Sequence, residues 1–337
     1  MYGKIGIDFH YRWKNSHSLF RWLIKNIGKG EMMMGRVNQE KIKSYLTPLV
    51  RAINNIPVST RLPSFWKAPK GYTVETLKID GIIVEHLIPD ESNGAIVYQL
   101  HGGGYTSPFG DMYRNQAVRY SESAGGAEVF SLDYDLAPEN KFPIALNQAI
   151  TVYQWMLEQG YKSQQMIFAG DSAGANLELA LSLWCKDHEI PLPRAIVALS
   201  PWATMETKYP SRQYNKKNDL ILGENGIEKL TLEVEHPSYI ENMDATQPYI
   251  SPLYGDFTGF PETLIQVSTY EVFYDEVIAL AEKMKQEGVD VQLSIYEELP
   301  HDFLVFLPKT EEAKAAWNEI YEFMHLQLDK KYRFKII

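Results

Sequence analysis

Cysteine is nearly absent from this chain of 337 residues, which contains Cys185 alone. A single thiol can form neither an intrachain disulfide nor a zinc site made of several thiolates. The chain also lacks a continuous apolar run at its start, because residues 1–18 mix Lys, Asp, His and Arg with apolar residues. Neither a secretion signal nor a membrane anchor is therefore indicated. We expect a cytoplasmic protein with no stable membrane association.

Positive charge is scarce as well, since 33 Lys and Arg stand against 43 Asp and Glu, for a formal net charge of −10. Proteins that follow nucleic-acid phosphates need clustered Lys and Arg. The local basic runs, Lys216-Lys217 and Lys330-Lys331, are too short for such a surface, so nucleic acid is not an expected partner. Apolar residues, by contrast, make up 45% of the chain, which is enough to bury a full core.

The most informative stretch is Gly170-Asp171-Ser172-Ala173-Gly174. It follows the apolar run 166–169, which predicts a strand, and precedes residues 175–184, whose pattern predicts a helix. A serine on such a turn, with a glycine two residues away on each side, indicates a nucleophile elbow that projects its hydroxyl into solvent. We predict that Ser172 is a nucleophile and that the Ala173 N–H faces an oxyanion formed by its attack. The alternative is an ordinary glycine-rich turn.

A second glycine motif, His101-Gly102-Gly103-Gly104, follows the predicted strand 95–100. Residues without side chains let the backbone approach a ligand and offer it amide N–H groups. We assign Gly103 and Gly104, together with Ala173, to an oxyanion hole. A flexible loop or a phosphate cradle is the alternative, but no Lys-Ser/Thr pair follows, as a phosphate-binding loop would require. His101 is expected to orient the loop rather than carry protons.

A serine nucleophile needs a general base, and a carboxylate that holds the base in its useful tautomer. Hydrolases built around such an elbow supply the acid and then the histidine after the serine. The histidines that follow Ser172 are His188, His236, His301 and His325. Among them, His301 comes just after a predicted strand, 289–296, where a loop at the carboxyl edge of a sheet begins. We predict that His301 is the base.

The carboxylate is expected after the preceding predicted strand, 264–268. Glu271 lies in the loop that follows, whereas Asp275 begins the next helical pattern. An acid in the first turn of a helix has a structural explanation, because it caps exposed amides and complements the helix dipole. We therefore predict that Glu271 is the triad acid and keep Asp275 as the alternative.

These residues resemble a known family, the hormone-sensitive-lipase-like carboxylesterases (bacterial family IV) of the α/β-hydrolase superfamily. The motifs that carry the resemblance are His101-Gly102-Gly103-Gly104, residues 134–139 with Phe142-Pro143, the elbow 170–174, and Ser251-Pro252-Leu253. The resemblance implies an α/β-hydrolase fold with a mostly parallel central sheet, flanking helices and a helical cap. It also implies an ester hydrolase with a Ser–His–acid triad, which requires no cofactor and no metal.

Two positions depart from the family's pattern. Glu271 stands where the family usually has aspartate, so the loop must withdraw or the imidazole must shift to accommodate one more methylene. Asp302 follows His301 where the family often has glycine, and the backbone of that loop is expected to differ.

One hydrolase domain with a discontinuous cap is the organisation we expect. The first cap segment is predicted over residues 1–65, which are strongly helical in character, and the second over 204–249. The catalytic core then comprises 66–203 and 250–337. The cluster Met32-Met33-Met34 offers an adaptable surface for an acyl chain, with core or hinge packing as an equal explanation.

The expected partner is a small ester with a short acyl chain, because no long apolar stretch suggests binding to lipid aggregates. An amidase or deacetylase with the same triad is one alternative. A non-catalytic small-molecule receptor on the same fold is another. The natural ester, the stereochemical preference and the question of a homo-oligomer stay open at this level.

Overall fold

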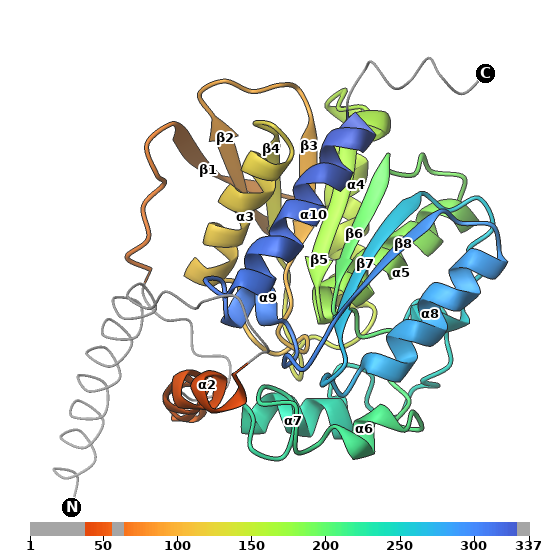
Figure 1. Ribbon diagram of the computed structural model, residues 1–337. Helices are drawn as coiled ribbons and strands as arrows, with labels where there is room; N and C mark the ends of the chain where they lie inside the picture. Colours follow the sequence, from red (N-terminus) through yellow and green to blue (C-terminus); the bar gives the residue numbers. More distant parts are fainter. Residues whose placement is uncertain (1–37, 56–63, 329–337) are drawn as a thin grey trace, which may run out of the picture.

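The computed structural model describes residues 38–55 and 64–328. At its centre lies an eight-stranded sheet in the order β1-β2-β4-β3-β5-β6-β7-β8 (Figure 1). The strands are β1 Tyr72–Ile79, β2 Ile82–Pro89, β3 Ile96–Leu100, β4 Glu128–Asp133, β5 Met166–Asp171, β6 Ala195–Leu199, β7 Glu262–Ser268 and β8 Val291–Tyr296. From β4 to β8 all neighbours are parallel, whereas β2 is antiparallel to both β1 and β4. The mostly parallel sheet of an α/β hydrolase is confirmed.

Helices cover both faces of this sheet. The helices of the described residues are α2 Gln39–Asn54, α3 Asp111–Ser123, α4 Ile144–Glu158, α5 Ala173–Asp187, α6 Ser211–Tyr214, α7 Glu228–Glu235, α8 Tyr274–Gln286, α9 Phe303–Phe306 and α10 Glu311–Leu328, with short 3₁₀ turns η1 Ser163–Gln165 and η2 Pro252–Tyr254. Helices α3 and α10 pack together in front of the sheet in Figure 1, and α4 and α5 pack together behind it. Because both faces are covered, β3 and β6 are buried along their whole length, as is typical of parallel strands.

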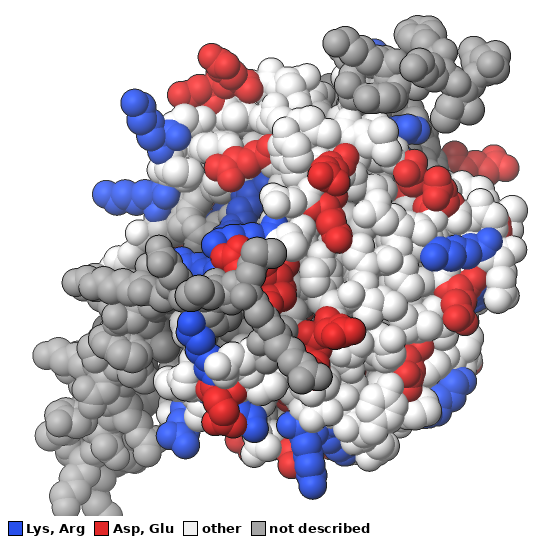
Figure 2. All heavy atoms as spheres, viewed as in Figure 1, with Lys and Arg blue, Asp and Glu red and all other residues white. Residues whose placement is uncertain are grey.

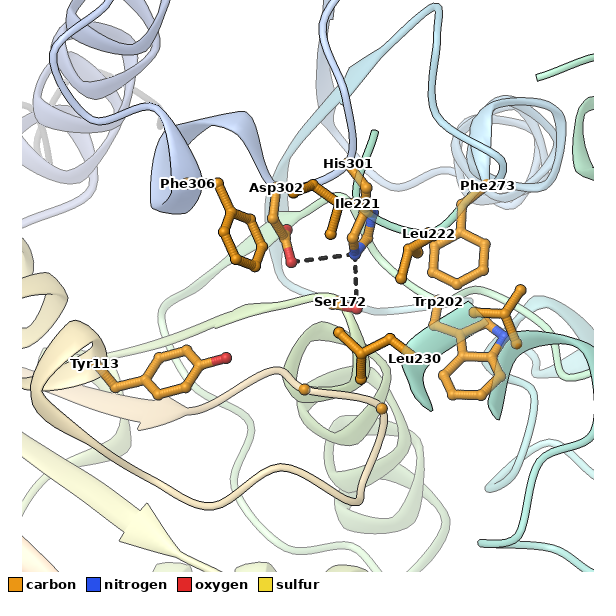
Figure 3. Close-up of a pocket in the computed structure, with 13 residues that line it drawn as sticks. Tyr113, Ser172, Trp202, Ile221, Leu222, Leu230, Phe273, His301, Asp302 and Phe306 are labelled. Atoms are coloured by element: carbon orange, nitrogen blue, oxygen red, sulfur yellow. Dashed lines mark hydrogen bonds and ion pairs between the residues drawn. The ribbon is translucent and has the colours of Figure 1, made fainter. Parts of the chain in front are cut away.

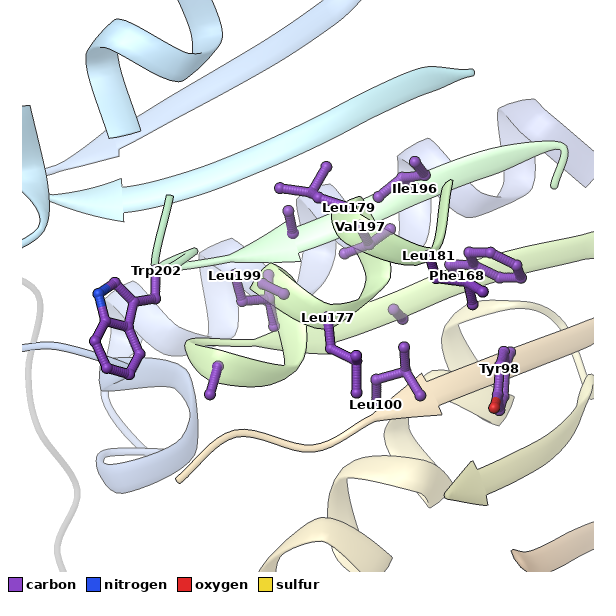
Figure 4. Close-up of a cluster of buried hydrophobic side chains, with 14 of the residues drawn as sticks. Tyr98, Leu100, Phe168, Leu177, Leu179, Leu181, Ile196, Val197, Leu199 and Trp202 are labelled. Carbon is purple, nitrogen blue, oxygen red and sulfur yellow. The ribbon is translucent and has the colours of Figure 1, made fainter. Parts of the chain in front are cut away.

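The apolar core is continuous between α5 and the central strands. Leu177, Leu179 and Leu181 of α5 lie among side chains of β3, β5 and β6, such as Leu100 and Phe168 (Figure 4). A helix that is apolar on nearly all sides must be buried, and α5 is buried over most of its surface. The position of its first turn, directly after Ser172, is therefore fixed by the core.

Helices α2, α6 and α7 gather beyond the carboxyl edge of the sheet (Figure 1). In α2, the Asn54 side-chain amide donates to the Gly226 carbonyl at 3.1 Å and its oxygen accepts from the Glu228 N–H at 2.9 Å. The Gln39 side chain donates to the Glu298 carbonyl at 2.6 Å. The part of segment 1–65 that is described thus contacts both segment 204–249 and the loop before His301.

The remaining part of the first predicted cap segment, residues 1–37 and 56–63, lies outside the described residues, and so does the cluster Met32-Met33-Met34. The domain boundaries therefore stay a prediction. On the face shown in Figure 2, acidic and basic side chains of the described residues are interspersed, and the basic ones form no continuous stripe. No helix within 38–55 or 64–328 is both long enough and apolar enough to cross a membrane.

A buried ion pair anchors segment 204–249 to the core. Arg212 of α6 lies 2.8 Å from the carboxylate of Glu276 in α8, and both side chains are almost fully buried. The same guanidinium donates to the carbonyl oxygens of Thr204, at 2.6 Å, and Val234, at 3.0 Å. One side chain therefore joins the start of the segment and the end of α7 to α8.

Removing one partner of the Arg212–Glu276 ion pair should destabilise the protein. Arg212→Leu leaves Glu276 buried without its cation, so we expect the free energy of unfolding to fall by about 3–5 kcal/mol in urea titrations. The double variant Arg212→Leu/Glu276→Leu should recover part of that loss, because no charge is then left buried. Lys217→Leu, an exposed basic residue of the same segment, is the matched control and should change little. A single variant as stable as wild type would contradict the anchoring role.

Candidate active site

Ser172 occupies the turn between β5 and α5 with a strained backbone, φ +53° and ψ −117°. A non-glycine residue with positive φ persists only where its surroundings hold it. Here the Ser172 N–H donates to the Leu199 carbonyl at 2.9 Å, and its carbonyl accepts from the Trp202 N–H at 3.1 Å. The segment just after β6 thus fixes the turn on both sides of the serine.

Close backbone packing explains the glycine that follows the serine by two residues. A Cβ on Gly174 would overlap the Leu100 carbonyl oxygen and the backbone of His101. The start of α5 therefore lies directly against the end of β3, where the second glycine motif begins. This contact places the turn that carries Ser172 beside the loop that carries Gly103 and Gly104.

Three side chains from three loops meet at the carboxyl edge of the sheet. His301 Nε2 lies 2.8 Å from Ser172 Oγ, and His301 Nδ1 lies 3.0 Å from Glu271 Oε2. The other carboxylate oxygen of Glu271 accepts from the Ser200 hydroxyl at 2.9 Å and the Ser268 N–H at 2.7 Å. A carboxylate held there favours the tautomer protonated on Nδ1 and leaves Nε2 to accept the serine proton.

Asp275, the alternative acid, lies elsewhere. Its carboxylate accepts hydrogen bonds from the Ser211 N–H and the Tyr214 hydroxyl, both at 2.7 Å. Both partners belong to α6, so Asp275 joins α8 to the second predicted cap segment. The structure brings Glu271 to His301 and leaves Asp275 apart from it.

The residues predicted for the oxyanion hole lie beside the nucleophile. Gly103 and Gly104 line the same pocket as Ser172. Ala173 is the first residue of α5, and the first amides of a helix have no acceptor within the helix. His101 is fully buried, stacks on Tyr134 with ring centres 4.1 Å apart, and contacts the Gly102 carbonyl through Nδ1 at 2.8 Å.

The expectation that Ser172 projects into solvent is wrong. Its exposed fraction is only 5%, because side chains from segment 204–249 and from the loop after β6 cover the turn. The serine instead opens into a pocket of about 370 Å³, part of which is open to solvent. One side of this pocket is apolar: Trp202 and Phe273 come from the core, and Leu222 and Leu230 come from segment 204–249 (Figure 3).

The other side of the pocket carries a charge. Tyr113, Asp302 and Phe306 lie on the opposite side of Ser172 in Figure 3. Asp302 Oδ2 lies 3.1 Å from His301 Nε2, the same nitrogen that faces the serine. The backbone of Asp302 is left-handed, with φ +51°, at the start of α9. Asp302, at the position where the family often has glycine, thus places a second carboxylate beside the nitrogen that faces Ser172.

Asp219 holds two of the site's loops together. Its carboxylate accepts from the His301 N–H at 3.2 Å and from the Val272 N–H at 3.1 Å. Sequence reasoning missed it because an aspartate inside a variable insertion carries no motif. Ser200, whose hydroxyl donates to Glu271, directly follows β6, and a hydroxyl at the end of an apolar run was a usable signal.

Carboxylates surround the imidazole of His301. Burial alone lowers its pKa, but the ion pairs with Asp302 and Glu271 raise it well above the ordinary 6.5. Burial raises the pKa of Glu271 to about 7, against the lowering effect of its bond with His301. Burial likewise raises the pKa of Asp219 and of Asp171, and the charge of His301 partly offsets both shifts.

Comparisons with known proteins identify the family of this fold. The profile of the α/β-hydrolase fold family matches residues 97–305. An esterase of Acinetobacter venetianus is 31% identical over 269 residues, covering 79% of this chain and 86% of that protein. An acetyl-hydrolase of Streptomyces hygroscopicus is 32% identical over 232 residues, covering 69% and 76%. The crystal structure of an esterase from the bacterial hormone-sensitive lipase family superposes with a TM-score of 0.70 at 28% identity, covering 92% of this chain and 98% of that one.

The charges around His301 predict how its imidazole titrates. Its pKa should lie above 6.5 in wild type, and Asp302→Asn should lower it, because an adjacent anion that favours the imidazolium is lost. The ring-proton resonances of His301, followed by NMR against pH, report this value directly. Asp90→Asn removes the same charge from an exposed position and should leave the resonance unchanged. An unchanged or raised pKa in Asp302→Asn would contradict the ion pair.

Proposed function

The chain belongs to the α/β-hydrolase family, among its hormone-sensitive-lipase-like carboxylesterases, and on this premise we propose that it hydrolyses short-chain acyl esters through an acyl-enzyme on Ser172. It is a carboxylic ester hydrolase. The observation that carries the proposal is the continuous contact from Ser172 Oγ through the two nitrogens of His301 to Glu271.

Acylation begins with attack of Ser172 Oγ on the ester carbonyl carbon, while His301 Nε2 takes the hydroxyl proton. The carbonyl electrons move to the oxygen, and the amides of Gly103, Gly104 and Ala173 donate to it. The imidazolium of His301 then protonates the alkoxide oxygen as its bond to carbon breaks. The alcohol leaves and the acyl group stays on Ser172.

Deacylation repeats these steps with water. His301 removes a proton from water as its oxygen attacks the acyl carbon, and it returns that proton to Ser172 Oγ as the acid leaves. In both halves a positive charge appears on a buried imidazole. Glu271 lies 3.0 Å from its Nδ1 and stabilises that charge without taking the proton.

A short acyl chain suits the apolar side of the pocket. Trp202 and Phe273 stack with ring centres 5.6 Å apart, and together with Leu222 and Leu230 they bound the space next to Ser172. The acyl group of a small ester removes its apolar surface from water there. The name of the Streptomyces relative, an acetyl-hydrolase, supports the same chain length.

We further propose that α2 and segment 204–249 act together as the cap. Hydrogen bonds join α2 to Gly226 and Glu228, at the start of α7. Leu230 of α7 in turn lines the pocket. A displacement of α2 would therefore move one wall of the site.

The first test is hydrolysis of p-nitrophenyl acetate, butyrate, octanoate and laurate by the purified full chain. We expect kcat/KM to be highest for acetate or butyrate, because bulky apolar side chains bound the space next to Ser172. Ser172→Ala should lower kcat by about 10⁶-fold, to the background, since the nucleophile is lost. Turnover untouched by Ser172→Ala, or none on any ester by folded protein, would overturn the proposal and bring amide substrates forward.

The triad acid is tested by a pair of variants with the same chemical change. Glu271→Gln should lower kcat by about 10³-fold or more, because an amide no longer stabilises the imidazolium. Asp275→Asn is the control, since that side chain contacts α6 rather than His301, and should change kcat less than tenfold, a bound of about 1.4 kcal/mol. Circular dichroism establishes that both variants fold. Equal losses would contradict the assignment of Glu271.

A further inference from the structure

The carboxylate of Asp302 is buried without enough hydrogen-bond donors. Its side chain is 5% exposed and lines the pocket. Oδ2 lies 3.1 Å from His301 Nε2, whereas Oδ1 has no hydrogen-bond partner within the described part of the chain. Burying a carboxylate oxygen that accepts no hydrogen bond costs free energy, unless a donor or a cation contacts it.

The proposed reaction removes the one hydrogen-bond partner that the Asp302 carboxylate has among the described residues, His301 Nε2. To act as a base, His301 must hold its proton on Nδ1 and present an unprotonated Nε2, with its lone pair free, to Ser172. In that state Nε2 carries no hydrogen and cannot donate to Asp302 Oδ2. Neither oxygen of Asp302 then has a hydrogen-bond partner among the described residues at the moment when an ester must bind.

Geometry places this carboxylate beside the leaving alcohol. His301 Nε2 must come within about 3 Å of the alcohol oxygen to protonate it. Asp302 Oδ2 lies 3.1 Å from the same nitrogen. The two distances together keep the carboxylate within about 6 Å of the ester's alcohol oxygen. A group two or three atoms along the alcohol moiety from that oxygen can therefore contact the carboxylate. The apolar side of the pocket, where the acyl group is proposed to bind, lies across Ser172 (Figure 3).

The surroundings favour a cation over a neutral donor. Among the described residues that line the pocket, Asp302 is the only carboxylate, and none is Lys or Arg. The ring of Phe306 lies beside the carboxylate, and Tyr113 lines the same side of the pocket farther from it (Figure 3). Aromatic rings attract ammonium groups that approach their faces.

We propose that Asp302 forms a cation subsite for the alcohol moiety, so that esters of amino alcohols, with an ammonium group two or three atoms from the ester oxygen, are preferred substrates. This inference rests on the proposed function, because it uses His301 as the acid that protonates the leaving alcohol. The ammonium group would contact the carboxylate that loses its contact with Nε2 when His301 acts as the base.

The test compares esters that differ only in charge. 2-(Dimethylamino)ethyl acetate, protonated at pH 7, has 3-methylbutyl acetate as its carbon isostere, and acetylcholine has 3,3-dimethylbutyl acetate. For each pair the ratio of kcat/KM, charged over neutral, should fall about tenfold or more in Asp302→Asn relative to wild type. The inductive effect of nitrogen on the ester is the same in both proteins, so the change in ratio isolates the carboxylate. Asp90→Asn should leave both ratios as in wild type.

Ratios that are unchanged in Asp302→Asn, while Ser172-dependent hydrolysis of p-nitrophenyl acetate persists, would overturn the subsite and leave the esterase proposal intact. If Asp302→Asn is inactive or unfolded, wild type alone decides by calorimetric binding of choline against 3,3-dimethyl-1-butanol. We expect choline to bind about tenfold more tightly or better, and equal binding would refute the subsite. Because calorimetry needs no turnover, it separates failure of the subsite from failure of the proposed esterase activity.

Discussion

The contact between the start of α5 and the end of β3 is the constraint on which the site depends. It requires glycine at position 174, because a side chain there would overlap the Leu100 carbonyl. Since α5 is buried on nearly all sides, its first turn cannot shift without disturbing the core. The strained Ser172 at that turn is therefore held at one place, and the loops after β3, β6, β7 and β8 are arranged around it. Strain of this kind persists only within such a rigid frame.

Buried negative charge is the second organising feature. Glu271 and Asp302 contact the two nitrogens of His301, and Asp219 bonds its backbone. With so many carboxylates around a single imidazole, the cation formed during proton transfer is stabilised, while the neutral base must be restored before attack. The two carboxylates contact different nitrogens. Glu271 contacts Nδ1 and favours the tautomer protonated there, whereas Asp302 contacts Nε2, the nitrogen that faces Ser172.

The segment 204–249 connects these features to the substrate. It supplies apolar side chains to one wall of the pocket, and its Asp219 holds the loops that carry His301 and Val272. The Arg212 ion pair fixes the same segment to α8. Hydrogen bonds and an ion pair thus join segment 204–249 to α8 and to the loops that carry Val272 and His301. This explains why an insertion without recognisable motifs contributes to the geometry of the site.

The sequence alone determined the features that depend on local pattern. The strand–serine–helix turn and the position of His301 after a strand follow from periodicity and neighbouring residues, which act over a few residues of chain, and the α/β fold was implied by the resemblance of the motifs to a known family. Only the tertiary structure decided what depends on approach between distant segments. It separated Glu271 from Asp275, covered Ser172, and placed β4, which was not anticipated, between β2 and β3. It also turned Asp302 toward the catalytic nitrogen, because side-chain direction and burial are set by packing, which no linear pattern records.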